Sequence, residues 1–178
     1  MKKTIFLDRD GTIIYDRGYI DSINEIEFPS STFDALEQLS INNYELIIIT
    51  NQSGIGRGYF TKEIVITVNQ EIVNQCTNHN ISFKKILFCP HKPISNCECR
   101  KPKIGLINKY LPDYDFNPKE SWMIGDKESD IGFGLNLGLS TILISNNDKH
   151  LKFSKYKPHF RVKNLKEATI KILSNEKH

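Results

Sequence analysis

Short apolar runs alternate with longer helix-like stretches along most of this 178-residue chain. This alternation is typical of βαβ units around a parallel sheet, because a buried strand needs only roughly four to eight residues and each crossover needs a helix. The runs predict strands at 4–7, 44–50, 83–88, 121–124 and 141–144, with a weaker sixth near 159–162. The intervening stretches predict helices at 31–41, 61–79, 104–111, 129–137 and 165–173. We therefore expect an α/β fold, a Rossmann-like three-layer sandwich with a central parallel sheet.

Length and charge limit the class of protein. A chain of this size can bury one core, so we expect a single domain over 1–178, with a polar loop at 146–158 and no linker. The net charge of +3 permits an anionic substrate but is too small to indicate nucleic acid. Charged residues at 8–10 interrupt the first apolar run far short of a signal sequence or membrane span. We expect a cytoplasmic monomer that binds neither nucleic acid nor membrane.

Two carboxylates stand one residue apart at the end of the first predicted strand. Asp8 and Asp10 are followed by Gly11 and Thr12, and ligands of open α/β sheets bind at the carboxyl ends of strands. Two such charges repel each other unless a cation or a reacting phosphate lies between them. The pair therefore suggests metal-assisted chemistry by a nucleophile and an acid/base, although a helix cap and a turn residue would give the same spacing.

Polar groups also follow the second, third and fourth predicted strands. Each could be structural if taken alone: a strand end, a surface cation or a helix cap. Their order along the chain favours a shared site, since each supplies a group that phosphoryl transfer needs. These groups are Thr50-Asn51-Gln52-Ser53, Arg100-Lys101-Pro102-Lys103 and Gly125-Asp126-Lys127-Glu128-Ser129-Asp130.

The order Asp-x-Asp-Gly-Thr, Thr, Lys and Gly-Asp over residues 5–131 resembles the haloacid dehalogenase superfamily of phosphatases. The resemblance implies that Asp8 is the nucleophile and that Asp10 is the acid/base. It implies that Thr50 and Lys101 neutralise the oxygens of the transferred phosphoryl group. It also implies a catalytic Mg²⁺, held by Asp8, the backbone carbonyl of Asp10 and Asp126.

Two expectations concern the surroundings of this site. Asp130 is left with two possible roles, support for the metal site or a cap for the helix that begins near residue 129. The intervals between the motifs are filled by predicted helices and strands, so we expect no cap domain. Short loops, at 12–26 and at 89–99, would then control access to the site.

A cluster of soft ligands lies between residues 89 and 99. Cys89, His91, Cys97 and Cys99 are the four ligands that tetrahedral Zn²⁺ requires, whereas a reduced set of thiols with an unrelated His is the alternative. Because the protein fills every position, this zinc would be structural. Lys101 follows the last ligand almost directly, so the zinc loop would fix the cation that meets the phosphate.

The zinc loop before Arg-Lys-Pro is similar to that of a subgroup with two branches. One branch removes the 7-phosphate of D-glycero-manno-heptose 1,7-bisphosphate, a precursor of lipopolysaccharide, and the other hydrolyses histidinol phosphate. Residues 16–19 and 50–59 resemble the heptose branch, whereas the short spacing between His91 and Cys97 resembles the histidinol branch. We expect a Mg²⁺-dependent heptose bisphosphate phosphatase, with histidinol phosphatase as the alternative. The expected substrate contacts, besides Thr50 and Lys101, are Asp16, Arg17, Gly18, Tyr19, Asn51, Gln52, Ser53, Arg57, Arg100 and Lys127.

Charge near the expected mouth bears on this choice. The mouth is expected to hold more Arg and Lys side chains than the single Lys101 that the reaction needs. These extra cations would bind a second phosphate better than the cationic end of histidinol phosphate, although nearby acidic side chains could bind that cationic end. These cations are Arg17, Arg57, Arg100, Lys103 and Lys127, and the acids are Asp16, Asp21 and Glu25. A different class of function, a zinc-bearing basic module that binds nucleic acid, would need neither Asp8 nor Asp10.

Overall fold

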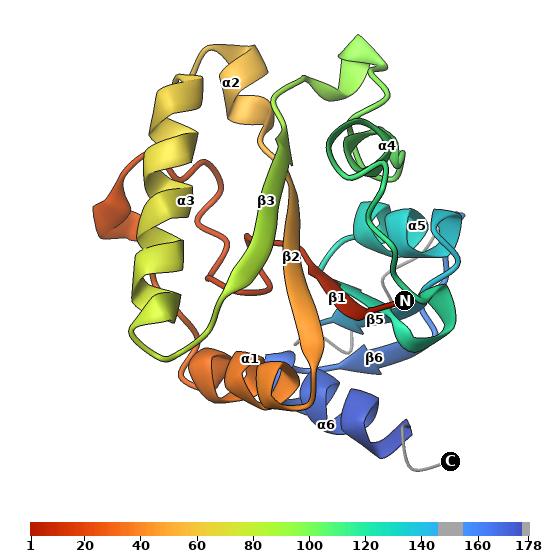
Figure 1. Ribbon diagram of the computed structural model, residues 1–178. Helices are drawn as coiled ribbons and strands as arrows, with labels where there is room; N and C mark the ends of the chain where they lie inside the picture. The colour runs from red at the N-terminus through yellow and green to blue at the C-terminus, as the bar shows by residue number, and fades with distance from the viewer. Residues whose placement is uncertain (146–154, 176–178) are drawn as a thin grey trace.

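The computed structural model describes residues 1–145 and 155–175, so most of the polar stretch expected as a loop at 146–158 lies outside the described residues. Its core is a six-stranded sheet in the order β3-β2-β1-β4-β5-β6, and every strand pair is parallel (Figure 1). The strands are β1 (Lys3–Leu7), β2 (Tyr44–Asn51), β3 (Phe83–Cys89), β4 (Trp122–Gly125), β5 (Ser140–Ile144) and β6 (Phe160–Val162). All six predicted strands are confirmed, with ends shifted by at most one residue.

Helices cover both faces of this sheet. They are α1 (Thr32–Ile41), α2 (Ser53–Arg57), α3 (Lys62–Thr77), α4 (Gly105–Tyr110), α5 (Glu128–Asn136) and α6 (Leu165–Asn175). Short 3-10 helices occur at η1 (Ile23–Glu25), η2 (Pro93–Ser95) and η3 (Pro118–Glu120). The five predicted helices are confirmed. The sequence did not indicate α2, because a five-residue helix with two glycines has no apolar periodicity.

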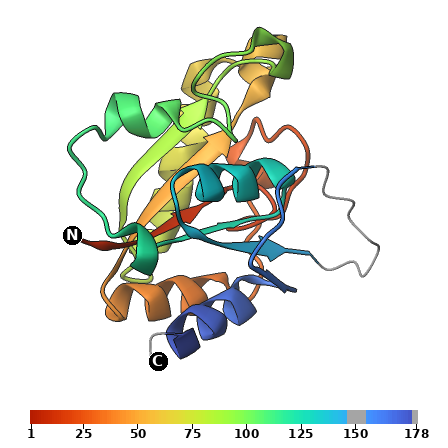
Figure 2. The ribbon, with the colours of Figure 1, turned by 90° about the vertical axis from the view of Figure 1, so that its right-hand side faces the viewer.

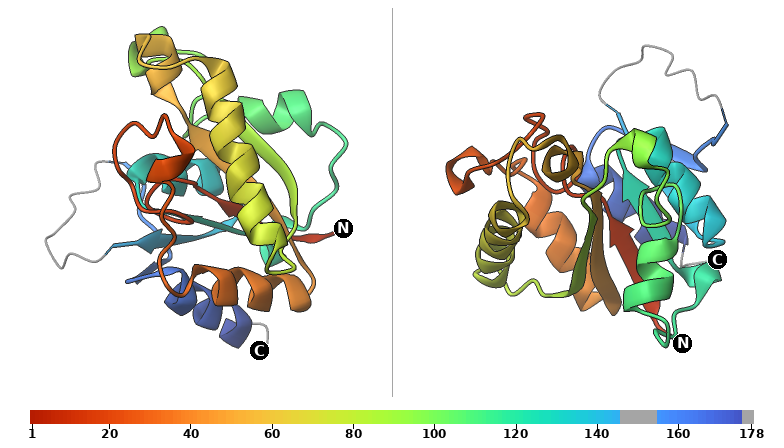
Figure 3. Two further views of the ribbon diagram at one scale, coloured as in Figure 1. Left: turned by 90° about the vertical axis from the view of Figure 1, so that its left-hand side faces the viewer. Right: turned by 90° about the horizontal axis from the view of Figure 1, so that it is seen from above.

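The two faces of the sheet follow from the alternation of side chains along each strand. In β1, Ile5 and Leu7 pack with α1, α3 and α6, whereas Phe6 packs with α4 and α5 on the other face. Figure 3 (left) shows α3 in front of the sheet with α1 and α6 along its lower side, and Figure 2 shows α4 and α5 on the side turned to the viewer. The result is the expected three-layer sandwich.

The strand order fixes where a ligand can bind. The chain builds outward from β1 to β2 and β3, then crosses back to place β4 beside β1. Open α/β sheets bind ligands outside the carboxyl ends of the strands at such a switch point. Within the described residues no cap domain is inserted over this edge, and none of the described helices is long and apolar enough to cross a membrane.

Candidate active site

The first acidic residue lies at the switch point itself. Asp8 comes directly after β1, its backbone N–H donates to the carbonyl of Ile124 in β4 at 2.9 Å, and its side chain is buried. Asp126 comes directly after β4, so the crossing of the chain brings together two carboxylates from distant segments. Asp10 is also buried, on the loop after Asp8.

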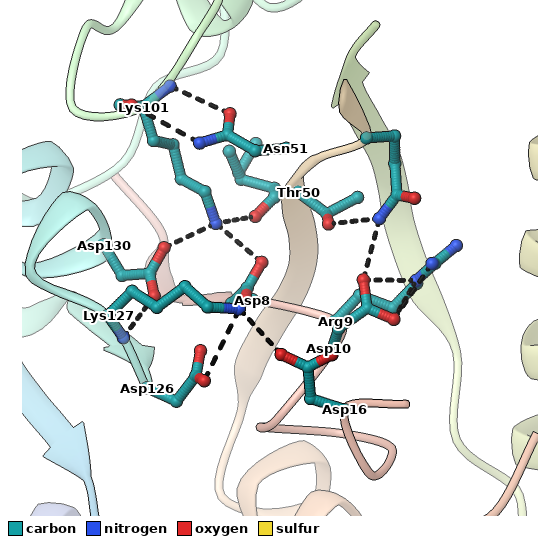
Figure 4. A network of polar contacts seen from close by, with 12 residues as sticks. Asp8, Arg9, Asp10, Asp16, Thr50, Asn51, Lys101, Asp126, Lys127 and Asp130 are labelled. Carbon is teal, nitrogen blue, oxygen red and sulfur yellow. Dashed lines mark hydrogen bonds and ion pairs between the residues drawn. The ribbon is translucent and has the colours of Figure 1, made fainter. Parts of the chain in front are cut away.

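A cavity of about 320 Å³ opens at this edge of the sheet. Its lining includes twelve of the predicted site residues, and it adds Ser129 and Asp130. The predicted residues that line it are Asp8, Asp10, Asp16, Gly18, Tyr19, Thr50, Asn51, Gln52, Ser53, Arg100, Lys101 and Lys127. The fold therefore gathers the ends of β1, β2 and β4 and the segment after β3 around one space (Figure 4).

Lys101 is the central cation of the cavity. Its buried Nζ lies 2.7 Å from Asp8 Oδ1 and 2.7 Å from Asp130 Oδ1, and it also donates to the carbonyl of Ile49. Burial by itself lowers the pKa of this lysine, but the Asp130 and Asp8 carboxylates outweigh burial and raise the pKa above its usual range. Lys101 is therefore held as an ammonium ion beside the first acidic residue.

Asp130 has two contacts that answer the question left open by the sequence. One oxygen pairs with Lys101, and Oδ2 accepts a hydrogen bond from the backbone N–H of Lys127 at 2.9 Å. The second contact caps the N-terminus of α5. A Cβ on Gly125 would lie 2.3 Å from the Asp130 Cβ, so only glycine allows this close approach. Asp130 thus ties the start of α5 to the central lysine.

Asp126 carries the clearest sign of a cation site. Its Oδ1 is buried and has no hydrogen-bond partner among the described residues. Burial, together with the charge of Asp8, raises the pKa of Asp126 to about 8. Oxygens of Asp8, Asp126 and Asp130 all lie within 4.8 Å of one another. Such a set of close carboxylate oxygens fits Mg²⁺. The ion would reduce the repulsion among the carboxylates and give the unpaired Asp126 oxygen a partner.

The residues after β2 support the site as well as line it. Gln52 donates from Nε2 to Asp10 Oδ2 at 2.7 Å and to Thr50 Oγ1 at 2.9 Å. Asn51 accepts from the backbone N–H of Lys101 at 3.0 Å. The sequence indicated phosphate contacts here but gave no sign of the bonds to Asp10 and Lys101, because these partners are 42 and 50 positions away in the chain.

An ion pair lies at the mouth of the cavity. Lys127 Nζ is 3.0 Å from Asp16 and 3.6 Å from Asp126 Oδ2, and Asp16 also accepts from the backbone N–H of Gly18 at 2.8 Å. Figure 4 shows this pair beside Asp8. The loop after β1 is thereby connected to the start of α5.

Three of the cations expected at the mouth do not line the cavity. The Arg17 guanidinium pairs with Glu27, and Arg57 is exposed at the end of α2. Lys103 donates to Glu98 at 2.8 Å and to Asn96, which places its side chain against the loop 89–99. Arg100 and Lys127 are the members of that set that line the cavity.

Arg9 is a buried cation between the two acidic residues, and its role was not predicted from the sequence. Its side chain is only 1% exposed and pairs with Asp10. The available signal was its position, since an arginine at the end of a buried strand needs acceptors to satisfy its guanidinium.

The Cys/His cluster also comes together in space. Cys89 Sγ lies 3.7 Å from His91 Nδ1, 3.5 Å from Cys97 Sγ and 3.1 Å from Cys99 Sγ. Cys99 Sγ lies 3.1 Å from His91 Nδ1 and 3.5 Å from Cys97 Sγ. These five separations, 3.1–3.7 Å, are near or slightly below the roughly 3.5–3.8 Å edges of a zinc tetrahedron with one nitrogen and three sulfur ligands.

The cluster is joined to the cavity by backbone contacts. Gln52 N–H donates to the carbonyl of Cys89 at 2.8 Å, and Gly56 N–H donates to the carbonyl of Pro90 at 2.9 Å. A Cβ on Gly56 would lie 2.8 Å from that same Pro90 oxygen. The loop 89–99 is therefore seated against α2, and the chain passes from it directly to Lys101.

Comparison with known proteins identifies relatives of two kinds. A family model described as HAD-hydrolase-like matches residues 98–168. A D-glycero-alpha-D-manno-heptose-1,7-bisphosphate 7-phosphatase of Campylobacter jejuni is 39% identical over 93% of this chain and 92% of its own length. The histidine biosynthesis bifunctional protein of Legionella pneumophila is 39% identical over 82% of this chain but only 42% of its own.

Among solved structures, a D,D-heptose 1,7-bisphosphate phosphatase from B. bronchiseptica, complexed with magnesium and phosphate, has the same fold. Its TM-score is 0.86 at 24% identity, and the match covers 97% of this chain and 99% of that one.

Proposed function

Because this chain belongs to the haloacid dehalogenase-like hydrolases, we propose that it removes the 7-phosphate of D-glycero-manno-heptose 1,7-bisphosphate through an aspartyl phosphate. The observation that carries the proposal is the cavity at the β1–β4 switch point, where two carboxylates and a buried lysine converge. Relatedness over nearly the whole chain to a heptose bisphosphate phosphatase supports the choice of substrate.

The reaction divides between the two acidic residues of the loop after β1. A carboxylate oxygen of Asp8 attacks phosphorus, and the bond from phosphorus to the sugar oxygen breaks. Asp10 gives its proton to that leaving oxygen, then takes a proton from the water that hydrolyses the aspartyl phosphate. Each cycle regenerates both residues and releases phosphate and the sugar monophosphate.

Lys101 and Thr50 bind the oxygens of the phosphoryl group during its transfer. Lys101 Nζ is already 2.7 Å from an Asp8 oxygen, so it meets the negative charge that arrives with the phosphate. Thr50 Oγ1 lines the same cavity and is oriented by Gln52. Because both groups are buried and bonded, little reorganisation is needed when charge develops in the transition state.

Mg²⁺ is the proposed catalytic metal, held by Asp8, Asp126 and the backbone carbonyl of Asp10. The unpartnered Asp126 oxygen and the raised pKa of that residue support a cation at this position. When bound, Mg²⁺ supplies positive charge that lets an anionic nucleophile approach an anionic phosphate.

Zn²⁺ is the proposed structural metal, held by Cys89, His91, Cys97 and Cys99. The support is the near-tetrahedral set of one nitrogen and three sulfur atoms, with no disulfide among these cysteines. A zinc ion there would hold the segment that leads into Lys101 without taking part in the chemistry.

The second phosphate of the proposed substrate needs cations beyond Lys101. Arg100 and Lys127 line the cavity and could contact a remote phosphate, and Tyr19 lines the same cavity. We assign Arg17 and Arg57 no direct contact unless their loops move, since Arg17 pairs with Glu27 and neither side chain lines the cavity.

Histidinol phosphate is the second candidate substrate. The short span between His91 and Cys97 supports it, as does identity with the Legionella bifunctional protein. Asp16 at the mouth could pair with the amine of that substrate, but Lys127 already occupies its carboxylate.

Comparing kcat/KM for the two anomers of heptose 1,7-bisphosphate with that for histidinol phosphate tests the proposal. We expect a clear preference for one heptose anomer, with release of a single phosphate and formation of the 1-phosphate. A preference for histidinol phosphate would overturn the substrate assignment.

Asp8→Asn tests whether the chain is an enzyme of this kind at all. We expect the variant to fold and to bind zinc while losing at least about 10⁴-fold in turnover, because an amide is not a nucleophile. Full activity in this variant would refute the nucleophilic role of Asp8. Salt-sensitive binding of DNA or RNA by a wild-type chain without phosphatase activity would favour the nucleic-acid alternative. We also propose that the enzyme is a cytoplasmic monomer that acts in the synthesis of lipopolysaccharide precursors.

A further inference from the structure

Arg9 has the largest of the fully buried side chains described, and no step proposed above uses it. Burying a guanidinium costs free energy unless its N–H groups are bonded, and a well-packed apolar side chain often stabilises a core at least as well. An arginine in this position, directly between Asp8 and Asp10, therefore calls for a reason beyond packing.

The contacts of Arg9 run in two directions. Nε lies 3.1 Å from both carboxylate oxygens of Asp10, and Nη2 lies 2.9 Å from Oδ1. On the other side, Nη1 donates to Oδ1 of Asn69 at 2.9 Å. Asn69 belongs to α3, sixty positions along the chain, and is itself only 6% exposed. The guanidinium is thus fixed between a loop carboxylate and a long helix.

The Asp10 carboxylate is consequently held from two sides. Arg9 contacts both oxygens, while Gln52 donates to Oδ2 at 2.7 Å. Figure 4 shows Arg9 against Asp10, and the same Gln52 amide also donates to Thr50 Oγ1. Together, the Arg9 guanidinium and the Gln52 amide fix the plane of the Asp10 carboxylate as well as its position.

We propose that Arg9 and Asn69 are positioning residues that orient the Asp10 carboxylate for proton transfer to the leaving oxygen. The inference rests on the proposed function in that Asp10 is the acid/base. A proton donor must lie within hydrogen-bond reach of the leaving oxygen, and small displacements cost a large part of its effect. Through its bond to Arg9, Asn69 connects the position of the Asp10 carboxylate to the rigid helix α3.

Asn69→Leu is the most direct test, because it keeps the size of the side chain and removes the acceptor for Arg9 Nη1. The readout is kcat/KM for two substrates, heptose 1,7-bisphosphate and 4-nitrophenyl phosphate. The alkyl leaving group needs a proton from Asp10, whereas 4-nitrophenolate leaves without one. We expect a loss of roughly tenfold or more for the sugar phosphate and less than about threefold for the aryl phosphate.

Two further variants separate positioning from stability. Asn69→Asp keeps an oxygen acceptor for Arg9 and should restore most of the sugar-phosphate activity. Gln70→Leu, at the next and exposed position of α3, should leave both activities unchanged. In an Asp10→Asn background, Asn69→Leu should cause no further selective loss.

An equal fall for both substrates, or no fall for either, would overturn the inference. If the wild-type enzyme prefers histidinol phosphate, that alkyl phosphate takes the place of the sugar, and the test is unchanged. A wild-type chain that hydrolyses no phosphomonoester would instead refute the proposed function.

Discussion

The two candidate metal sites of this molecule are built in opposite ways. The carboxylate site draws its oxygens from the loop after β1 and the segment after β4, which the strand order brings together. The Cys/His site takes all four ligands from residues 89–99. The first set has three carboxylates beside a cavity that also contains a buried lysine, whereas the second supplies by itself the four ligands that a tetrahedral ion requires. A site assembled across the sheet depends on the packing of remote segments, and a local site depends on the conformation of one loop.

Asp10→Asn should produce the largest effect among the changes that test this contrast. We expect kcat to fall by about 10²–10⁴-fold, because the amide can neither give nor take the proton. Asparagine keeps one oxygen for Arg9, and magnesium needs only the backbone carbonyl, so Mg²⁺ affinity should hardly change. Calorimetric titration with Mg²⁺, alongside steady-state kinetics, checks both parts.

The control for Asp10→Asn is Asp126→Asn, which should weaken Mg²⁺ binding as well as turnover. Near-normal turnover in Asp10→Asn would refute its acid/base role. An equal loss of Mg²⁺ affinity in the two variants would refute the assignment of the Asp126 carboxylate, but not the Asp10 carboxylate, as a metal ligand.

Cys97→Ser tests the local site and should have an intermediate effect. Loss of one thiolate should weaken zinc binding and lower the free energy of unfolding by about 2 kcal/mol, a fall in Tm of roughly 4–8 °C. Activity should fall as well, because the loop seated on α2 leads into Lys101. Zinc content, thermal unfolding and kcat/KM measured on the same preparation check this.

Cys76→Ser is a matched change for comparison with Cys97→Ser, because Cys76 is a buried core thiol outside the cluster. It should lower stability without releasing zinc. A Cys97→Ser protein that is stable, zinc-free and fully active would show that the loop needs no metal.

Arg17→Ala should have the smallest effect, although the sequence suggested a substrate contact. Its guanidinium pairs with Glu27 at the surface, outside the cavity lining, and exposed pairs contribute only about 0–1 kcal/mol. We expect kcat/KM for the bisphosphate to change by less than about threefold. Lys127→Ala, which removes a cation from the cavity lining, should raise KM more. The reverse order would mean that the loop after β1 closes over the substrate.

Most of the fold could be predicted because its signals are local. The apolar runs of β1 to β5 are short and bounded, and α3 carries its own periodicity. The weaker β6 was also found, whereas α2 was missed because Gly54 and Gly56 leave no apolar face. Within the carboxylate site, the acidic pair and the lysine were visible as a motif, but the contacts of Asp130, Asn51 and Gln52 were not.

By itself, the sequence determined the alternation of strands and helices, the acidic pair and the cluster of three cysteines and a histidine, since each depends on residues that are neighbours in the chain. The tertiary structure decided which charges meet. It placed Arg9 against Asn69, joined Lys101 to both Asp8 and Asp130, and turned Arg17 away from the cavity toward Glu27. The physical reason is that an ion pair or hydrogen bond depends on distances of a few ångströms, which only the packing of remote segments fixes.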